Sequence, residues 1–322
     1  MKRKILFEGA LFALVCLILI VTTSCQTSDD GQAVTVAQNS GASGEYDPNK
    51  VVPSPIFAPI YPPLPHAFRD MYGIQLLLQA PPGAIKKAVM SPLEPAGSAD
   101  KFILLMGHTA DVNDGGFYSH EVALNAPVTF NGRQGTTTMV EYIDTDMGLV
   151  AGREVYGWPK KMAEIYYREN QGTNTWTFTV NKMKDQGNIP LIKVIYKVTN
   201  TPSNVEWPGG GPTLLVRRIP PASKTMKVLN QLVCVGCSRP EEAGIPLIGS
   251  GPAPKPANEL RTQGQRTETT GTATVQFFDG PWDPLTMFGP VKVLDAKMSF
   301  TPGRMQGGLG VGDVLDQWES EQ

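Results

Sequence analysis

Two adjacent lysines carry the most specific chemistry in this chain of 322 residues. Lys160 and Lys161 follow Trp158 and Pro159, and the segment around them is apolar. If the lysines continue into a strand, their side chains point to opposite faces, and one of them can enter an apolar cavity. Desolvation destabilises an ammonium group and lowers its pKa, and a neutral amine can attack a ketone to form an imine. Two solvated lysines in an exposed turn are the alternative.

Three short motifs surround and include this pair. They are PVTFNG at Pro127 to Gly132, GRE at Gly152 to Glu154, and PKK at Pro159 to Lys161. At these intervals the motifs resemble the acetoacetate decarboxylase family. In that family the first lysine of the pair forms the Schiff base, which implies Lys160 here. The second, at Lys161, is the neighbouring charge invoked to lower the pKa of the first. That family is itself the usual example of a lysine activated in this way, so the effect rests here on the resemblance.

The resemblance also implies polar groups in the pocket, and this sequence has only some of them. A glutamate lies six residues before the first proline of the PVTFNG run, at Glu121. It is expected to relay a proton to an enamine carbon or to orient the substrate, with a solvated strand carboxylate as the alternative. A second family glutamate falls near Met106, in an apolar stretch, and the family's arginine falls near Met71 to Ile74. No acid replaces the glutamate nearby, and Arg69, a little earlier in the chain, is the alternative position for the arginine. The loss of these polar groups questions acetoacetate as the substrate but leaves imine chemistry intact.

Two further residues near the lysines are expected to shape the pocket. Trp158 supplies apolar surface beside the amine. Arg153 can bind a substrate carboxylate or a structural acid such as Asp144, and the structural pairing is favoured. The expected pocket around Lys160 and Glu121 therefore comprises four more residues: Lys161, Trp158, Arg153 and Met106.

These residues predict an enzyme, a carboxy-lyase that forms a Schiff base with a small β-keto acid and releases CO2 and a ketone. One alternative keeps the imine and changes the reaction, as in an aldolase or dehydratase acting on another oxo acid. A second alternative is a lipoprotein that binds a small ligand in the same cavity without catalysis. Neither a cofactor nor a metal is expected, and the resemblance implies a homo-oligomer.

The elements around the lysines are predicted to be mostly strands. Residues 173–180 alternate with period two, and similar runs recur from residue 101 to residue 300, including 136–143, 149–156 and 162–168. Asn131-Gly132 and residues 170–172 are typical of hairpin turns. The only helical signals are at 84–90 and 284–288. With 33 glycines and 28 prolines, this pattern predicts a mainly β (α+β) fold, a closed antiparallel barrel-like sheet with few short helices.

The N-terminal residues indicate export. Residues 1–25 have a basic start, an apolar run and small residues before Cys25, which resembles the lipidation site of bacterial lipoproteins, although Thr22 replaces the usual leucine. An ordinary cleaved signal or an uncleaved anchor are the alternatives. Residues 26–65 are predicted to form a flexible Pro-rich tether, residues 66–305 the catalytic domain with an insertion at 238–264, and residues 306–322 a tail. The expected location is the cell envelope, with a lipid anchor in the membrane.

Charge and cysteine content argue against nucleic-acid binding and against a zinc site. The net charge is −2 and no basic block lies beyond the first four residues, so nucleic-acid binding has no electrostatic support. Cys234 and Cys237 have the spacing of a redox or half-zinc pair, but no second pair completes a zinc site. A local disulfide or two buried thiols is favoured.

Overall fold

The computed structural model describes residues 66–97, 100–111, 118–183, 187–208, 211–223, 225–237, 267–309 and 313–320. All of them belong to the second of the two units into which the chain divides, 48–322. The predicted signal segment, Cys25, the tether and the insertion at 238–264 lie outside the described residues. Within the described part, no helix is long and apolar enough to cross a membrane.

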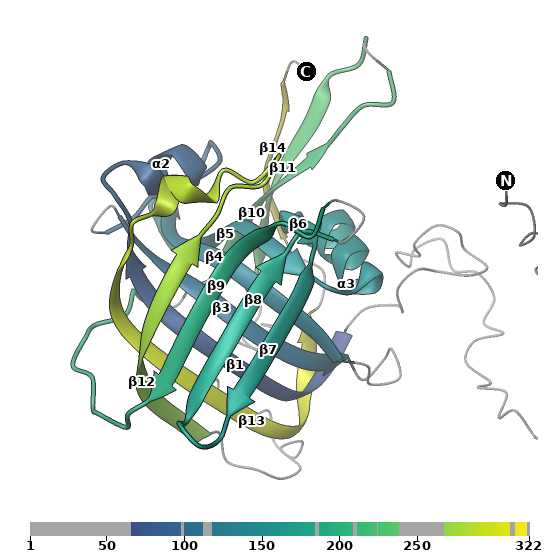
Figure 1. Ribbon diagram of the computed structural model, residues 1–322. Coiled ribbons are helices and arrows are strands. Elements are labelled where there is room, and N and C mark those ends of the chain that lie inside the picture. Colours follow the sequence, from purple (N-terminus) through teal and green to yellow (C-terminus); the bar gives the residue numbers. More distant parts are fainter. Residues whose placement is uncertain are drawn as a thin grey trace, which may run out of the picture. The chain divides into compact units, whose positions relative to one another are not determined.

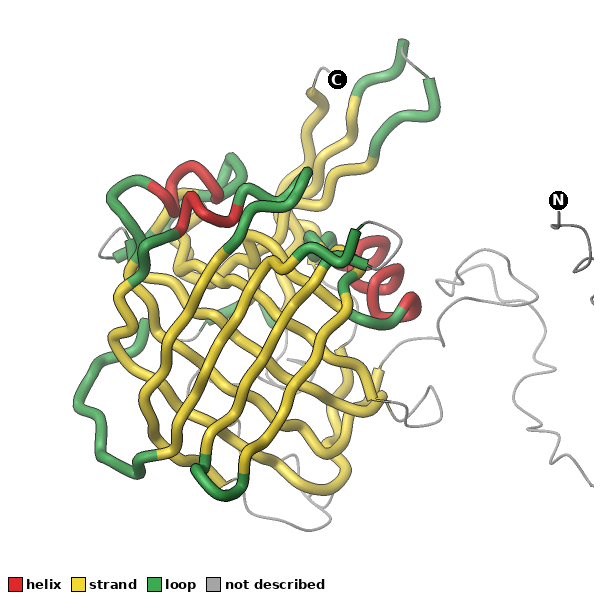
Figure 2. Tube along the Cα trace, viewed as in Figure 1, coloured by secondary structure: helices red, strands yellow, loops and turns green. Residues whose placement is uncertain are grey.

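Strands dominate the described residues, as Figures 1 and 2 show, and the helices are few and short. The helical elements are α2 (Ala84–Ala88), α3 (Asp146–Ala151), the π-helix η1 (Gly152–Tyr156) and the 3-10 helix η3 (Leu285–Phe288). The strands are β1 (His66–Gln79), β2 (Glu94–Pro95), β3 (Lys101–Asp111), β4 (Tyr118–Phe130), β5 (Arg133–Ile143), β6 (Lys160–Met162), β7 (Glu164–Asn170), β8 (Thr175–Asn181), β9 (Pro190–Val198), β10 (Thr213–Ile219), β11 (Val228–Val235), β12 (Thr267–Phe277), β13 (Lys292–Leu309) and β14 (Asp313–Ser320).

The sheet is open and mixed, so the predicted closed antiparallel barrel is wrong. Its strands run in the order β14-β11-β10-β5-β4-β3-β1-β13-β12-β9-β8-β7, with β2 beside β4 and β6 beside β5. The two end strands, β14 and β7, do not pair with each other. Most neighbours are antiparallel, but β5 runs parallel to both β10 and β6. Period-two patterns reveal which residues form strands, yet they contain no information on which strands pair at the ends.

Two local predictions have opposite outcomes. Asn131 and Gly132 connect β4 to β5 with positive φ angles of 48° and 80°, as the hairpin signal predicts. Residues 149–156, predicted as a strand, instead form the end of α3 and the whole of η1. The alternating apolar residues of this segment fit either structure, and tertiary contacts described below decide for the helix.

The sheet buries apolar side chains in separate clusters. The largest includes Ile74, Leu104, Met106, Val122 and Tyr142, all at most 1% exposed. Met106, Val122 and Tyr142 are direct cross-strand partners on β3, β4 and β5, so they share one face of the sheet. Alternate residues on these strands face the other side, where a smaller cluster of Tyr156, Trp158 and Leu215 lies.

The described C-terminal residues include a strand of the sheet. Strand β14, within the segment predicted as a tail, pairs with β11 from Asp313 to Ser320. Cys234, at the end of β11, forms a disulfide with Cys237. Cys234 also packs in an apolar cluster with Leu214 and Leu232. The local disulfide therefore closes the turn after β11 beside a small second core.

Candidate active site

Three neighbouring strands bring one lysine and two glutamates together. Glu141 on β5 is the parallel partner of Lys160 on β6, so their side chains lie on the same face. Ala123 on β4 is the partner of Glu141, and Glu121, two residues earlier, shares its face. The register of β4, β5 and β6 therefore places Glu121, Glu141 and Lys160 side by side.

The contacts within this triad are short, and most of it is buried. The Lys160 Nζ atom donates a hydrogen bond to Glu121 Oε1 at 2.7 Å and lies 3.2 Å from Glu141 Oε1. The side chains of Lys160 and Glu141 are only 8% and 6% exposed, whereas Glu121 is 34% exposed. Glu121 is therefore the member of the triad that communicates with solvent, and Glu141 is enclosed.

Electrostatics in the triad differ from what the sequence predicts for Lys160. Burial alone lowers the pKa of the Lys160 amine, but the adjacent Glu121 and Glu141 carboxylates outweigh it, so the pKa is raised. Burial raises the pKa of Glu141 to about 8, Lys160 opposes this shift, and the charge of Glu121 and a hydrogen bond with it reinforce the shift. Both shifts favour a charged Lys160 amine and a protonated Glu141 carboxyl group at neutral pH.

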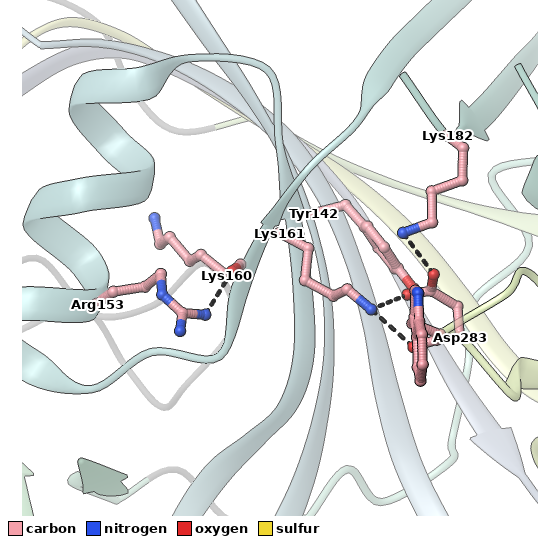
Figure 3. Close-up of polar contacts among 7 residues, drawn as sticks. Tyr142, Arg153, Lys160, Lys161, Lys182 and Asp283 are labelled. Carbon is pink, nitrogen blue, oxygen red and sulfur yellow. Dashed lines mark hydrogen bonds and ion pairs between the residues drawn. The ribbon is translucent and has the colours of Figure 1, made fainter. Parts of the chain in front are cut away.

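Lys161 lies on the opposite side of β6, as Figure 3 shows. Its Nζ atom is 2.5 Å from Asp283 Oδ1, and it also donates to the backbone oxygen of Trp282. Asp283 is almost fully buried and additionally binds Lys182 Nζ at 2.6 Å and the Tyr142 hydroxyl at 2.7 Å. Burial raises the pKa of Asp283, but hydrogen bonds from Lys161, Lys182 and Tyr142 outweigh it and lower it. Lys161 thus neutralises a buried acid and does not point toward Lys160.

The GRE motif shapes the wall against which Lys160 packs. A Cβ atom on Gly152 would lie 2.6 Å from both Cδ and Cε of Lys160, so only glycine leaves room for this side chain. Arg153 donates from Nη1 to the backbone oxygen of Lys160 at 2.9 Å. Arg153 therefore binds a carbonyl group, whereas Asp144, the acid suggested as its structural partner, pairs with His120.

The π-helix that carries this motif is fixed by contacts from β10. Gly157, with φ of 84°, ends η1, and a Cβ atom there would lie 2.6 Å from the Cβ atom of Arg217. Arg217 donates from Nη1 to the carbonyl oxygens of Glu154 and Val155 at 2.7 and 3.0 Å. These bonds satisfy carbonyls that the helix end leaves without partners. They explain why 149–156 is helical despite its strand-like pattern.

The two apolar residues predicted to line the pocket are placed differently. Trp158 is buried, and its ring centroid lies 5.8 Å from Lys160 Nζ. Beside it, a small pocket is lined by residues that include Gly157, Pro159 and Leu215. Met106 lies instead in the large core on the other face of the sheet, away from the triad.

Asp144 and His120 form a separate contact next to the triad. The carboxylate of Asp144 accepts from the backbone N–H of His120 at 2.8 Å, and its other oxygen lies 2.5 Å from His120 Nδ1. Asp144 directly follows β5, and His120 directly precedes Glu121 on β4. This pair therefore fixes the chain where β5 leads toward α3. Within the described residues, no cluster of three or more His, Cys, Asp or Glu side chains could hold a metal ion.

Glu141 is the site residue that the sequence analysis missed. A lone acid in the strand MVEYI resembles a solvated strand residue, and no motif marks it. Its place beside Lys160 depends on the parallel pairing of β5 with β6, two strands joined through α3 and η1. One signal in the sequence could have identified it. A β4–β5 hairpin with its turn at Asn131-Gly132 places Glu121 and Glu141 at neighbouring positions on one face of the sheet.

A family model for acetoacetate decarboxylase matches residues 53–315. This chain belongs to the acetoacetate decarboxylase family. Curated relatives include the acetoacetate decarboxylase of Ralstonia nicotianae, 33% identical over 109 residues, which cover 34% of this chain and 43% of that enzyme. The acetoacetate decarboxylase of Streptomyces nogalater is 25% identical over 52% of this chain and 66% of that enzyme. The match spans less than half the length of the first of these relatives.

Solved structures support the fold. An acetoacetate decarboxylase-like enzyme from Sphingomonas wittichii RW1 superposes with a TM-score of 0.61, covering 86% of this chain and all of that chain at 16% identity. The acetoacetate decarboxylase of Legionella pneumophila gives a TM-score of 0.60, covering 83% of this chain and 94% of that chain, also at 16% identity. The enduracididine biosynthesis enzyme MppR, in complex with the condensation product of pyruvate and imidazole 4-carboxaldehyde, gives 0.57 at 15% identity, covering 84% and 98%. At such identities these likenesses describe the fold alone.

Proposed function

We propose that this protein is a Schiff-base enzyme for a small keto acid, with Lys160 as the nucleophile and decarboxylation of a β-keto acid as the reaction. The observation that supports this most is the buried Lys160 amine, held 2.7 and 3.2 Å from two carboxyl groups. A structural lysine needs one counter-charge, whereas imine chemistry needs a nucleophile with proton donors and acceptors within hydrogen-bond reach. Family membership supports the same class of chemistry.

In the proposed reaction the amine adds to the ketone and water leaves. The protonated imine then withdraws electrons from the bond to the carboxylate, CO2 departs, and an enamine remains. Glu121, or a water molecule that it positions, protonates the enamine carbon, and hydrolysis releases the ketone. Trp158 supplies an apolar wall that favours the charge-dispersed transition state over the substrate carboxylate.

A second reaction on the same imine is favoured by the second carboxyl group. Decarboxylation needs one proton delivered to carbon, whereas aldol condensation or dehydration needs a base and an acid at neighbouring atoms. Glu121 and Glu141, both in contact with the amine, can supply both. An aldolase or dehydratase acting on another oxo acid is therefore the second candidate.

Measuring CO2 released from acetoacetate and longer β-keto acids separates these candidates. We expect release by the wild-type protein and none by Lys160→Ala. A covalent imine adduct without CO2 would favour the second candidate. Absence of both CO2 and adduct across a panel of keto acids would leave ligand binding without catalysis and overturn the enzymatic proposal.

We also propose that Cys25 carries a lipid that anchors the protein in the cell envelope, because small residues precede it after an apolar run. Labelling with a palmitate analogue tests this. Label in the wild-type protein but not in Cys25→Ser supports the anchor, and equal label in both contradicts it.

A further inference from the structure

We propose that Glu121 and Glu141 share one proton and act together as the acid–base group that makes the Lys160 amine nucleophilic. This inference rests on the proposed function and deepens it. It assigns a catalytic role to Glu141, and it replaces a permanently neutral lysine by one that loses its proton only when a substrate is bound.

The geometry supports a shared proton. The two carboxyl groups lie on one face of neighbouring strands, and each has an oxygen within hydrogen-bond or ion-pair distance of the same Lys160 Nζ atom, at 2.7 Å for Glu121 and 3.2 Å for Glu141. Two carboxylates this close repel each other, so one proton is held between them, as in other paired carboxyl sites. With one positive amine and one negative carboxylate, the triad then has no net charge, which suits the burial of Lys160 and Glu141.

Charges on the surrounding elements do not disturb this assignment. Arg153 on η1 is bound to the Lys160 carbonyl oxygen, and Arg217 on β10 is bound to η1 carbonyls and to Gln231. Lys161 faces the other side of β6, and His120 on β4 pairs with Asp144. The groups that act on Glu141 are Lys160 and Glu121, with burial as the largest influence.

The proton transfers balance without a further reactant. The Lys160 ammonium gives a proton to Glu121, and the neutral amine bonds to the carbonyl carbon while the carbonyl oxygen takes the proton of Glu141. The new nitrogen then returns a proton to Glu141, and the hydroxyl group leaves as water with the proton of Glu121. The products are a protonated imine, an ionised Glu121 and a neutral Glu141, so the pair ends in its starting state.

The exposure of the two acids matches these roles. Glu121, at 34% exposed, can exchange protons with solvent after the imine is hydrolysed. Glu141, at 6% exposed, keeps its proton away from water until a carbonyl oxygen approaches. The raised pKa of Glu141, about 8, agrees with a group that is still protonated at neutral pH.

The test measures how fast the imine forms as a function of pH. The full-length protein is mixed with acetoacetate or pyruvate, aliquots are reduced with borohydride at timed intervals, and adducts are quantified by intact mass. For the wild-type protein we expect the rate to fall as the pH rises through about 8, where the shared proton is lost. If Lys160 acted without the carboxyl pair, imine formation would instead accelerate as the pH rises, because a larger fraction of the amine becomes neutral.

Variants assign the effect to the pair. We expect Glu141→Gln to form the imine about a hundredfold more slowly at neutral pH and to lose the fall near pH 8. Glu121→Gln should be slow at every pH, and Glu206→Gln, a change at an exposed residue, should match the wild type. A wild-type rate and pH profile for Glu141→Gln would overturn the inference while leaving the proposed function intact. No adduct in the wild type would instead overturn the proposed function.

An infrared titration of the unmodified protein needs no variant. A protonated carboxyl band at neutral pH that disappears as the pH rises through about 8 supports the shared proton. Absence of that band at neutral pH overturns it, even if Glu141→Gln does not fold.

Discussion

Gly152→Ala tests whether imine formation depends on the position of the Lys160 side chain. The added Cβ atom would lie 2.6 Å from Cδ and Cε of Lys160 and 3.4 Å from Nζ. An ordinary contact begins at about 3.4 Å, so the lysine side chain must move by nearly 1 Å from its observed position beside the two glutamates. Displacement of a reacting group by this amount can reduce a rate about a hundredfold, whereas overpacking costs the fold only about 1–3 kcal/mol.

The assay combines the borohydride trapping rate at neutral pH with the free energy of unfolding. Gly148→Ala is a matched control, because its Cβ atom would meet Ile143 Cδ1 rather than the lysine. We expect both variants to fold and only Gly152→Ala to lose about two orders of magnitude in trapping rate. Equal trapping rates for Gly152→Ala and the wild type would show that the observed side-chain position is not the reactive one.

Two other predictions concern stability, and a third concerns the trapping rate of a Lys161 variant. The pKa of Glu141 is raised from 4.5 to about 8 in the folded state, so its contribution to the free energy of unfolding is complete below about pH 4.5 and is lost as the pH rises to 8. Urea unfolding of the wild-type protein should show a loss of at most about 5 kcal/mol over this range. The same profile should be flatter in Glu141→Gln. An equal decline in both proteins would contradict this origin. Asp283→Asn leaves Lys161 and Lys182 without their shared counter-charge and should cost about 3–5 kcal/mol, whereas Lys161→Met should change the trapping rate less than tenfold. If the trapping rate of Lys161→Met fell as far as that of Gly152→Ala, Lys161 would instead be the group that sets the pKa of Lys160.

The strands and the nucleophile candidate were predictable from sequence, but the arrangement around them was not. Alternation identified β4, β5 and β8, and motif spacing singled out Lys160 and Glu121. Direction and pairing of strands are set by contacts distant in sequence, so the open edges and the parallel β5–β6 pair were not visible.

The pKa of Lys160 and the partner of Lys161 likewise depend on residues that are distant in sequence. The sequence predicts that burial lowers the pKa of Lys160, and burial does act in that direction. The carboxylates of Glu121 and of Glu141, which β5 places beside the amine, outweigh burial and raise the pKa of Lys160. Lys161 points away because adjacent strand residues alternate, and its partner Asp283 lies 122 residues later in the sequence.

The most direct test of the account is to locate the borohydride-reduced adduct within the protein. Wild-type protein and Lys160→Ala are incubated with a keto acid, reduced, digested and analysed by peptide mass spectrometry. We expect one modified peptide, with the added mass on Lys160, and no corresponding adduct in the folded Lys160→Ala variant. An adduct on another lysine, or one that persists in Lys160→Ala, would contradict it.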